Sequence, residues 1–379
     1  MQVLQKLIQA DDRQRRRLAQ PPPFQLCAFF FTLSVVEGIF RWYNTPMKIV
    51  IFESDPSEEG YLKESLTGLD LAFVAEKLTL ETAGQAAGAD VVSIFTGSHI
   101  DAALLDAITG TKLIVTRTTG YDHVDLVAAK AKGVQVTNVP GYGSVAVAEH
   151  AFALLLAISR RIFDAARQVR EEGEFHVTAM QGFDLFAKKI GVLGTGRIGK
   201  NAARIAKGFG MQIMLFDAHP DGAFTQEIGA RYYSLDDVLA TADILTLHLP
   251  ALPETMHIIN ADAFAKMKRG MVIINTARGS LIDTEALLAA IQDGVVSHVG
   301  LDVLEDETEL SDESELVMGG KKINDWKALV MDHILIERPE VLITPHIAFH
   351  TVEADRERLG VVVSCIQSFT KGEPLKNVL

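Results

Sequence analysis

The sequence contains few cysteines and lacks any metal-ligand spacing. Its 379 residues include only two, Cys27 and Cys365, which form no C-x-x-C pair. So few cysteines argue against a disulfide framework and a structural zinc site, and they are typical of a reducing compartment. We therefore expect a cytoplasmic protein without a bound metal.

Positive charge is also scarce. Lysine and arginine number 36 against 49 aspartates and glutamates, which leaves a net charge of −13, and no basic stretch follows residue 46. These features disfavour nucleic acid and anionic membrane surfaces as partners. The 48% of hydrophobic residues is ordinary for a globular protein, and the length is sufficient for two domains with sizeable cores.

The first 46 residues differ from the rest. A basic cluster at 13–17 and three prolines precede an apolar stretch over 26–36. This order resembles a signal peptide, but no small-residue cleavage site follows, and the stretch is short for a transmembrane helix. Because a strand pattern begins at Met47, we interpret 1–46 as an upstream-start artefact or a disordered leader, with a targeting segment as the alternative.

From Met47 onward, short apolar runs alternate with helical patterns, which is typical of parallel sheets with helices on both faces. The fold class predicted is α/β, with two Rossmann-like or flavodoxin-like parallel-sheet domains. The predicted strands are 48–52, 91–95, 113–116, 135–138, 190–193, 212–216, 244–249, 271–276, 296–303 and 341–344.

A helix over 145 to about 161 is apolar almost all round and is therefore expected to be buried between the domains, with Ser144 as its N-cap. The final helix, about 352–372, is expected to return to the first domain. The first predicted domain thus comprises 47–146 and 346–379, and the second predicted domain, 147–345, is inserted into it. Residues 305–326 are acidic and predict a surface loop or short helices.

The segment 188–217 carries the most specific pattern. Gly194, Gly196 and Gly199 follow an apolar run and open a helix as G-x-G-x-x-G, and Asp217 ends the next run. Such glycines permit a tight turn and close approach of a pyrophosphate to the helix N-terminus, and such an acid accepts hydrogen bonds from the adenosine ribose. Asp217 would repel a 2′-phosphate, which favours NAD over NADP. The alternative to a dinucleotide site is that the glycines serve only a tight turn. With the dinucleotide interpretation, 147–345 is the NAD-binding domain, and 47–146 with 346–379 is the substrate domain.

A dinucleotide implies hydride transfer, which requires a carboxylate binder and an acid/base group. Arg278 follows the run MVII, at the strand end where ligands bind in open parallel sheets. His346 follows another strand and a proline, and histidine is a natural acid/base near neutral pH. Asp302 and Glu307 follow a third strand. The loop Thr96-Gly97-Ser98 offers backbone N–H groups to an anion.

These segments resemble the D-isomer-specific 2-hydroxyacid dehydrogenase family. The resemblance covers residues 47–379 and lies in GTGRIG, NVPGYGSVAVAEH, NTARGSLID, LDVLEDE and TPHIAFHT. It implies that Arg278 binds the substrate, that His346 is the catalytic acid/base and that Glu307 pairs with it. The aromatic Phe349 after TPH is similar to the D-lactate dehydrogenase branch, in which it would bound the side-chain pocket.

The residues expected to bind NAD, from the fingerprint and from the resemblance, are Gly194, Thr195, Gly196, Arg197, Ile198, Gly199, Asp217, His248, Pro250, Thr276, Ala277 and Asp302. The expected substrate contacts are Thr96, Gly97, Ser98, Arg278 and Phe349. The implied activity is NAD-dependent reduction of a small 2-oxo acid to a D-2-hydroxy acid, foremost pyruvate to D-lactate, by a homodimer.

Two kinds of alternative stay open. The substrate could be hydroxypyruvate, glyoxylate or a branched 2-oxo acid, or the protein could be a non-enzymatic NAD-sensing scaffold on the same fold. A long-type phosphoglycerate dehydrogenase is disfavoured because the chain ends soon after the last helix. Formate dehydrogenase chemistry is disfavoured because it needs no proton-donating His/Glu pair.

Overall fold

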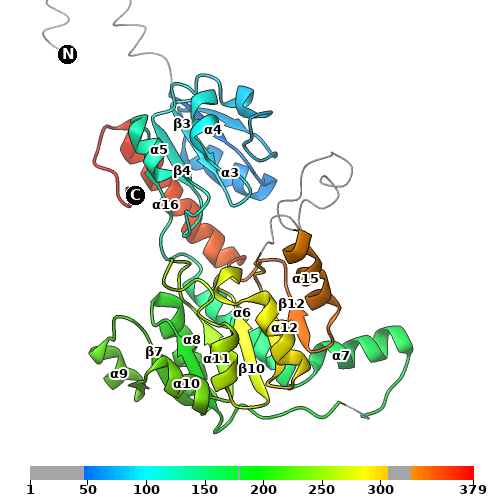
Figure 1. Ribbon diagram of the computed structural model, residues 1–379. Coiled ribbons are helices and arrows are strands. Elements are labelled where there is room, and N and C mark those ends of the chain that lie inside the picture. The colour runs from blue at the N-terminus through cyan, green and yellow to red at the C-terminus, as the bar shows by residue number, and fades with distance from the viewer. Residues whose placement is uncertain (1–46, 178–179, 306–325) are drawn as a thin grey trace, which may run out of the picture.

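A computed structural model describes residues 47–177, 180–305 and 326–379, which form two parallel β-sheets flanked by helices (Figure 1). Residues 1–46 lie outside the described residues, as do Glu307 and almost all of the predicted acidic loop.

The first sheet has five parallel strands in the order β2-β1-β3-β4-β5. They are β1 (Lys48–Ile51), β2 (Asp70–Phe73), β3 (Val91–Ile94), β4 (Leu113–Thr116) and β5 (Gln135–Thr137). The associated helices are α3 (Pro56–Ser65), η1 (Ala83–Ala86), α4 (Ala102–Ala107), α5 (Leu126–Ala131) and α16 (Val352–Thr370). The strand order is that of flavodoxin-like folds.

The second sheet has seven parallel strands in the order β12-β11-β10-β9-β6-β7-β8. They are β6 (Lys189–Leu193), β7 (Gln212–Phe216), β8 (Arg231–Tyr232), β9 (Ile244–Leu247), β10 (Met271–Asn275), β11 (Val296–Leu301) and β12 (Val341–Ile343). Its helices are α6 (Ser144–Ser159), α8 (Arg197–Gly208), α9 (Gly222–Ile228), α10 (Leu235–Thr241), α11 (Ala261–Lys266), η3 (Gly279–Leu281), α12 (Thr284–Gln292) and α15 (Trp326–Glu337).

Two edge strands, β2 and β8, were not predicted from the sequence. Each is short, and the side chains of β2 are exposed or half-buried, so neither carries the continuous apolar run of a buried parallel strand. The two predicted parallel-sheet domains are confirmed.

Helix α6 connects the two sheets. Phe152, Leu154 and Ile158 pack into the core of the second sheet, whereas Ala146 in the first turn joins the core of the first. The predicted N-cap was wrong: the helix is capped by Gly143, whose φ of 65° is left-handed, and Ser144 is the first helical residue. Glycine adopts this conformation without the steric cost that a side chain would bring.

The final helix returns to the first sheet, as predicted. Leu359, Val362 and Ile366 of α16 pack against Ile49 and Ile51 of β1. In Figure 1 this helix, coloured red, runs from the junction of the two domains along the first sheet. The last strand, β12, belongs to the other sheet, so the loop between β12 and α16 crosses from one domain to the other.

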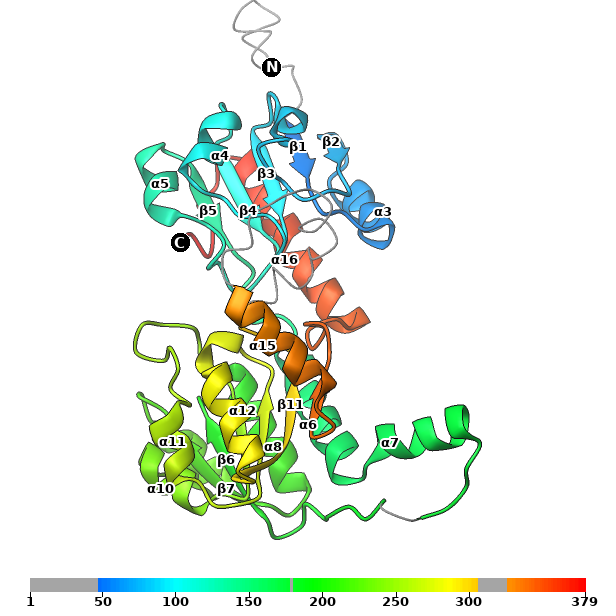
Figure 2. The ribbon, with the colours of Figure 1, turned by 45° about the vertical axis from the view of Figure 1, so that its right-hand side comes forward.

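A helical arm projects from the second domain. It consists of α7 (Ile162–Arg167) and η2 (Gln168–Glu172), and Figure 2 shows it extending away from the body of the molecule. The sequence analysis did not predict this arm. No helix among the described residues is long and apolar enough to cross a membrane.

Candidate active site

The predicted site residues of the second domain follow the carboxyl ends of its strands. The glycine motif follows β6, Asp217 follows β7, His248 follows β9 and Arg278 lies just beyond β10. Asp302 follows β11, and His346 lies just beyond β12. Because all strands are parallel, these ends share one edge of the sheet, which is where ligands bind in open α/β folds.

The glycine motif forms a cradle that fits a pyrophosphate. A Cβ atom added to Gly199 would lie 1.9 Å from the carbonyl oxygen of Gly194, so this position requires glycine for close helix–strand packing. A Cβ atom added to Gly196 would meet nothing within 4 Å. Gly196 also precedes the first turn of α8, whose N–H groups favour an anion. The open space before this helix therefore suits a phosphate.

Internal hydrogen bonds hold the carboxylate of Asp217, the residue expected to bind the ribose. Its Oδ2 accepts hydrogen bonds from Thr195 N (2.6 Å) and Thr195 Oγ1 (2.8 Å), and its Oδ1 accepts one from His219 N (2.8 Å). Burial alone would raise the pKa of Asp217, but these hydrogen bonds outweigh burial and lower it. The group therefore remains a carboxylate, the form that accepts hydrogen bonds from ribose hydroxyls.

Two polar atoms near the strand ends lack internal partners. Thr276 Oγ1 and His248 Nδ1 are buried, and neither has a hydrogen-bond partner among the described residues. Burial lowers the pKa of His248 to about 4, so its ring is neutral. Buried polar atoms are usually paired, and such unpaired atoms fit a site completed by a polar ligand.

The remaining predicted cofactor residues differ in their surroundings. Arg197 Nη1 donates to the carbonyl oxygen of Pro140 (3.2 Å), so this side chain contacts the segment that leads into α6. Ile198 packs against the core, whereas Pro250 is exposed. Ala277 N donates to Asn275 Oδ1 (3.0 Å), which shapes the turn before Arg278.

Arg278 faces the first domain. Its Nη1 donates to the carbonyl oxygen of Ala277 (2.7 Å), and its Nε lies 3.4 Å from Asp122 Oδ2. A Cβ atom added to Gly120 would lie only 2.0 Å from Arg278 Nη2. The guanidinium thus lies against the loop after β4, in which sequence reasoning identified no functional residue. The signal that was available was the glycine of the TTGYDH segment, directly after a buried strand.

Asp302 organises the loop that carries His346. Its carboxylate accepts hydrogen bonds from Thr344 Oγ1 (2.5 Å), Ile347 N (3.0 Å) and Ala348 N (2.8 Å). Burial would raise the pKa of Asp302, but its hydrogen bonds hold that pKa below its usual range. His150 Nε2 of α6 also lies 3.5 Å from Asp302 Oδ1.

His346 itself has a left-handed backbone, with a φ of 52°, and its N–H donates to the carbonyl oxygen of Asp302 (2.9 Å). A non-glycine residue in this conformation is uncommon and is found where the surrounding structure enforces it, often at functional sites. Its ring lies 6.1 Å from the ring of Phe349, centroid to centroid. The predicted pair of His346 with Glu307 lies partly outside the described residues and stays a prediction.

Phe349 connects His346 to two further aromatic rings. Phe349 contacts Tyr142 at 6.3 Å and Phe95 at 5.7 Å between centroids, both edge to face. Tyr142 and Phe95 come from the first domain, and sequence reasoning did not select either. Burial raises the pKa of Tyr142 to about 12, so its hydroxyl is protonated.

The loop Thr96-Gly97-Ser98, which was predicted to contact the substrate, makes hydrogen bonds to Glu53 of the same domain. Gly97 N donates to Glu53 Oε1 (2.6 Å), and Ser98 is fully buried with its hydroxyl bonded to Glu53. Thr96 is exposed. The donors of Gly97 and Ser98 therefore serve the fold, and it is the Gly120 loop that the structure brings against Arg278.

Comparison with known proteins agrees with this geometry. Residues 152–348 match the family model described as "D-isomer specific 2-hydroxyacid dehydrogenase, NAD binding domain". The chain is 36% identical to a 2-hydroxyacid dehydrogenase homolog of Haemophilus influenzae, over 88% of this chain and 99% of that protein. It is 35% identical to the D-lactate dehydrogenase of Escherichia coli, over 88% of this chain and 100% of that protein.

A solved structure is similar as well. The D-lactate dehydrogenase of Aquifex aeolicus, determined with NAD and lactic acid, superimposes with a TM-score of 0.77 at 32% identity. The match covers 86% of this chain and 96% of that one.

Proposed function

We propose that this chain, which belongs to the D-isomer-specific 2-hydroxyacid dehydrogenase family and binds NAD, reduces pyruvate to D-lactate. The observation that carries the proposal is the position of Arg278 against one loop of the first domain, with His346 beside Phe349, which contacts Tyr142 and Phe95 of that domain. A carboxylate binder, an acid/base group and an apolar surface are what a small 2-oxo acid requires.

Arg278 binds the substrate carboxylate in this proposal. Its planar guanidinium matches a carboxylate in a bidentate manner, and its positive charge also polarises the neighbouring carbonyl group. The backbone at Gly120 borders the same space, because the absent side chain lets the guanidinium approach it closely. Asp122 holds Arg278 in place through a long contact of 3.4 Å between exposed groups, which is weak enough to yield to a substrate.

His346 donates the proton. NADH, when bound, supplies the hydride. The imidazolium gives its proton to the carbonyl oxygen, and in the reverse direction neutral His346 accepts a proton from the hydroxyl. We propose that Glu307 accepts a hydrogen bond from the other ring nitrogen, which fixes the tautomer of His346.

The aromatic wall supports pyruvate over larger substrates. Phe349 lies beside His346 and contacts both Tyr142 and Phe95, so the side chain of the substrate meets rings rather than charged groups. A methyl group suits such a surface, and the similarity to two D-lactate dehydrogenases points the same way. Hydroxypyruvate, glyoxylate and branched 2-oxo acids are the alternatives.

An assay of NADH oxidation with a panel of 2-oxo acids tests the proposal. We expect the highest kcat/KM with pyruvate and D-lactate as the product. If another 2-oxo acid has a higher kcat/KM than pyruvate, that acid is the preferred substrate and the assignment of pyruvate is wrong. If the protein binds NADH but oxidises it with none of these 2-oxo acids, the result would favour the non-enzymatic NAD-sensing scaffold.

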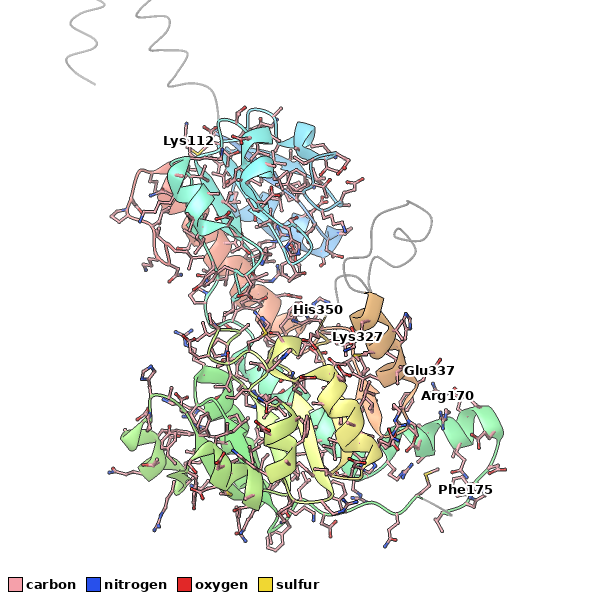
Figure 3. The ribbon with its side chains drawn as sticks, in the orientation of Figure 1. Lys112, Arg170, Phe175, Lys327, Glu337 and His350 are labelled. Atoms are coloured by element: carbon pink, nitrogen blue, oxygen red, sulfur yellow. The ribbon has the colours of Figure 1, made fainter. Side chains whose placement is uncertain are left out.

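The projecting arm supports a homodimer. Apolar side chains along it are exposed, and Phe175, labelled in Figure 3 beyond α7, is 93% exposed. The others are Ile162, Phe163, Val169 and Val177. Exposed apolar groups gathered on a projection are typical of an interface. We propose that a second copy of the chain covers them and that the protein is cytoplasmic, in keeping with its two cysteines.

A further inference from the structure

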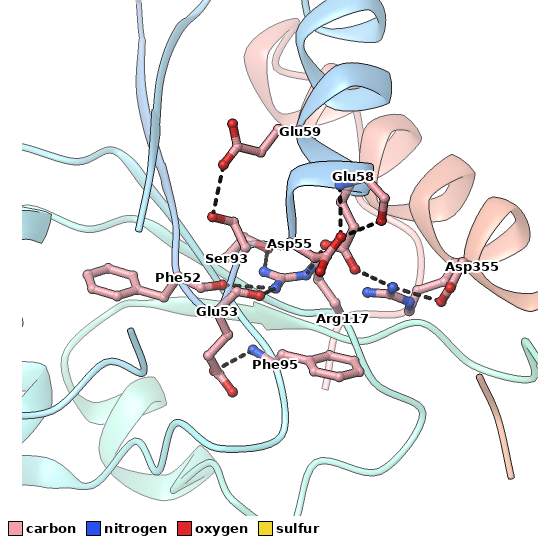
Figure 4. A network of polar contacts seen from close by, with 12 residues as sticks. Phe52, Glu53, Asp55, Glu58, Glu59, Ser93, Phe95, Arg117 and Asp355 are labelled. Carbon is pink, nitrogen blue, oxygen red and sulfur yellow. Dashed lines mark hydrogen bonds and ion pairs between the residues drawn. The ribbon is translucent and has the colours of Figure 1, made fainter. Parts of the chain in front are cut away.

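A carboxylate from the chain itself occupies the loop after β3. Glu53 Oε1 accepts a hydrogen bond from Gly97 N (2.6 Å), and Glu53 Oε2 accepts one from the hydroxyl of Ser98. Glu53 Oε2 also accepts a hydrogen bond from Phe95 N (2.9 Å), and this contact is drawn in Figure 4. Three donors from one loop thus converge on one side chain. Hydrogen bonds to a carboxylate are roughly twice as strong as those between neutral groups, so Glu53 holds this loop firmly.

The backbone of Glu53 is itself held in an unusual conformation. Its φ is 52°, a left-handed conformation that is unfavourable for an L-residue with a side chain. Arg117 stabilises it, because Nη2 donates to the carbonyl oxygens of both Phe52 (2.8 Å) and Glu53 (2.7 Å). Arg117 is completely buried, and although burial lowers its pKa to about 10, it stays protonated at neutral pH.

The held loop places the ring of Phe95. The guanidinium carbon of Arg117 lies 5.6 Å from the ring centroid of Phe95, and that of the buried Arg358 lies 4.8 Å from it. Arg358 is held in turn by Glu58 and Asp355. Figure 4 shows Glu53, Arg117 and Phe95 within this polar network.

Phe95 is the link between the network and the proposed pocket. Its ring contacts Phe349 edge to face at 5.7 Å, and Phe349 contacts His346 at 6.1 Å. A displacement of Phe95 would therefore give Phe349 room to move away from His346. Three successive contacts connect the Glu53 carboxylate to His346: Glu53 to Phe95, Phe95 to Phe349 and Phe349 to His346.

We propose that Glu53 is a positioning residue that sets substrate selectivity by fixing Phe95 behind Phe349. The inference rests on the proposed function, because Phe349 must bound the substrate side chain for Phe95 to matter. With Glu53 in place the wall is rigid and favours a methyl group. Without the charge of Glu53 the loop after β3 becomes more mobile, the rings of Phe95 and Phe349 can be displaced, and longer 2-oxo acids are accepted.

The test compares Glu53→Gln with Phe95→Leu, which alters the wall directly. Glu59→Gln is the matched control, because Glu59 follows the same strand and contacts Ser54 and Lys63 but makes no hydrogen bond to the loop after β3. The measured quantity is the ratio of kcat/KM for pyruvate to that for 2-oxohexanoate. We expect this ratio to fall about tenfold in both variants, since a pocket wall discriminates a methylene group by roughly 10- to 200-fold.

Amide hydrogen exchange provides a readout that does not depend on turnover. In Glu53→Gln the N–H groups of Phe95 and Gly97 should exchange faster, whereas in Glu59→Gln they should not. Faster exchange with an unchanged kcat/KM ratio would overturn the selectivity role, and unchanged exchange would overturn the clamp itself. If the wild-type protein turns over no 2-oxo acid, the proposed function fails before any variant is compared.

Discussion

Replacing Gly120 by alanine should displace Arg278 without unfolding the protein. The added Cβ would lie 2.0 Å from Arg278 Nη2 and 3.3 Å from its Cζ, far inside van der Waals contact. Gly120 does not have a left-handed φ, so alanine brings no backbone strain there. The nearest colliding atom is the far end of a flexible side chain, so the guanidinium will move rather than the loop.

The expected cost follows from the hydrogen bonds that Arg278 would lose. A hydrogen bond to a charged group contributes about 1.5–3 kcal/mol. At about 1.4 kcal/mol per factor of ten, the loss of one such bond to the substrate carboxylate corresponds to a fall of roughly 10- to 100-fold in kcat/KM. The affinity for NADH should be nearly unchanged, because the glycine cradle and Asp217 lie on other strands.

Steady-state kinetics with pyruvate, NADH titration by fluorescence and a thermal melt together test this. Gly60→Ala is the control, because Gly60 lies in α3 and a Cβ atom there meets nothing within 4 Å. We expect wild-type kinetics from the control and a melting temperature close to wild type from both variants. An unchanged kcat/KM in Gly120→Ala would refute the contact between Arg278 and this loop. Weakened binding of NADH would refute the assignment of Arg278 as the residue that binds the substrate carboxylate.

Four further outcomes are expected. His346→Ala should lower kcat by about 10²- to 10⁴-fold with NADH affinity retained, and full activity would contradict its acid/base role. Asp217→Ala should shift the kcat/KM preference from NADH towards NADPH, and an unaltered preference would mean that another residue reads the ribose. Phe175→Asp should convert a dimer into a monomer in light scattering, and an unchanged mass would place the interface elsewhere. Because the pKa of Asp302 is lowered on folding, its carboxylate stabilises the protein above a pH of about 4 and ceases to do so as the pH falls through the folded pKa. Asp302→Asn should therefore lower the free energy of unfolding at neutral pH, and the difference from the wild-type protein should become smaller at acid pH. A difference that does not depend on pH would contradict this.

The parts of the fold that the sequence predicted are those encoded by contiguous residues. The strand, glycine turn, helix and acid of 188–217 lie within one stretch, and the structure places them as β6, α8 and β7 with Asp217 at the end. Buried parallel strands carry continuous apolar runs, which a single sequence displays clearly. The short edge strands β2 and β8 lack such runs and were missed.

Contacts between distant residues were not predictable in the same way. The loop Thr96–Gly97–Ser98 has the composition of an anion site, but the anion it binds is Glu53, 44 residues from Gly97. Arg278 and Asp122 are 156 positions apart. The local sequence pattern identifies which residues at strand ends can donate or accept hydrogen bonds. Which residues they bind depends on how the strands and the two sheets pack, and this is not visible in the local sequence.

The arrangement assigns different tasks to the two sheets. The NAD cradle, Arg278 and the aspartate that shapes the loop of His346 all follow strands of the second sheet. Glu53, Phe95 and Gly120 follow strands of the first. The histidine and Phe349 lie in the segment that crosses between them. In the proposed mechanism, chemistry and selectivity rest on separate scaffolds, so we expect a change at Glu53 to alter the accepted side chain while Arg278 and His346 keep their positions.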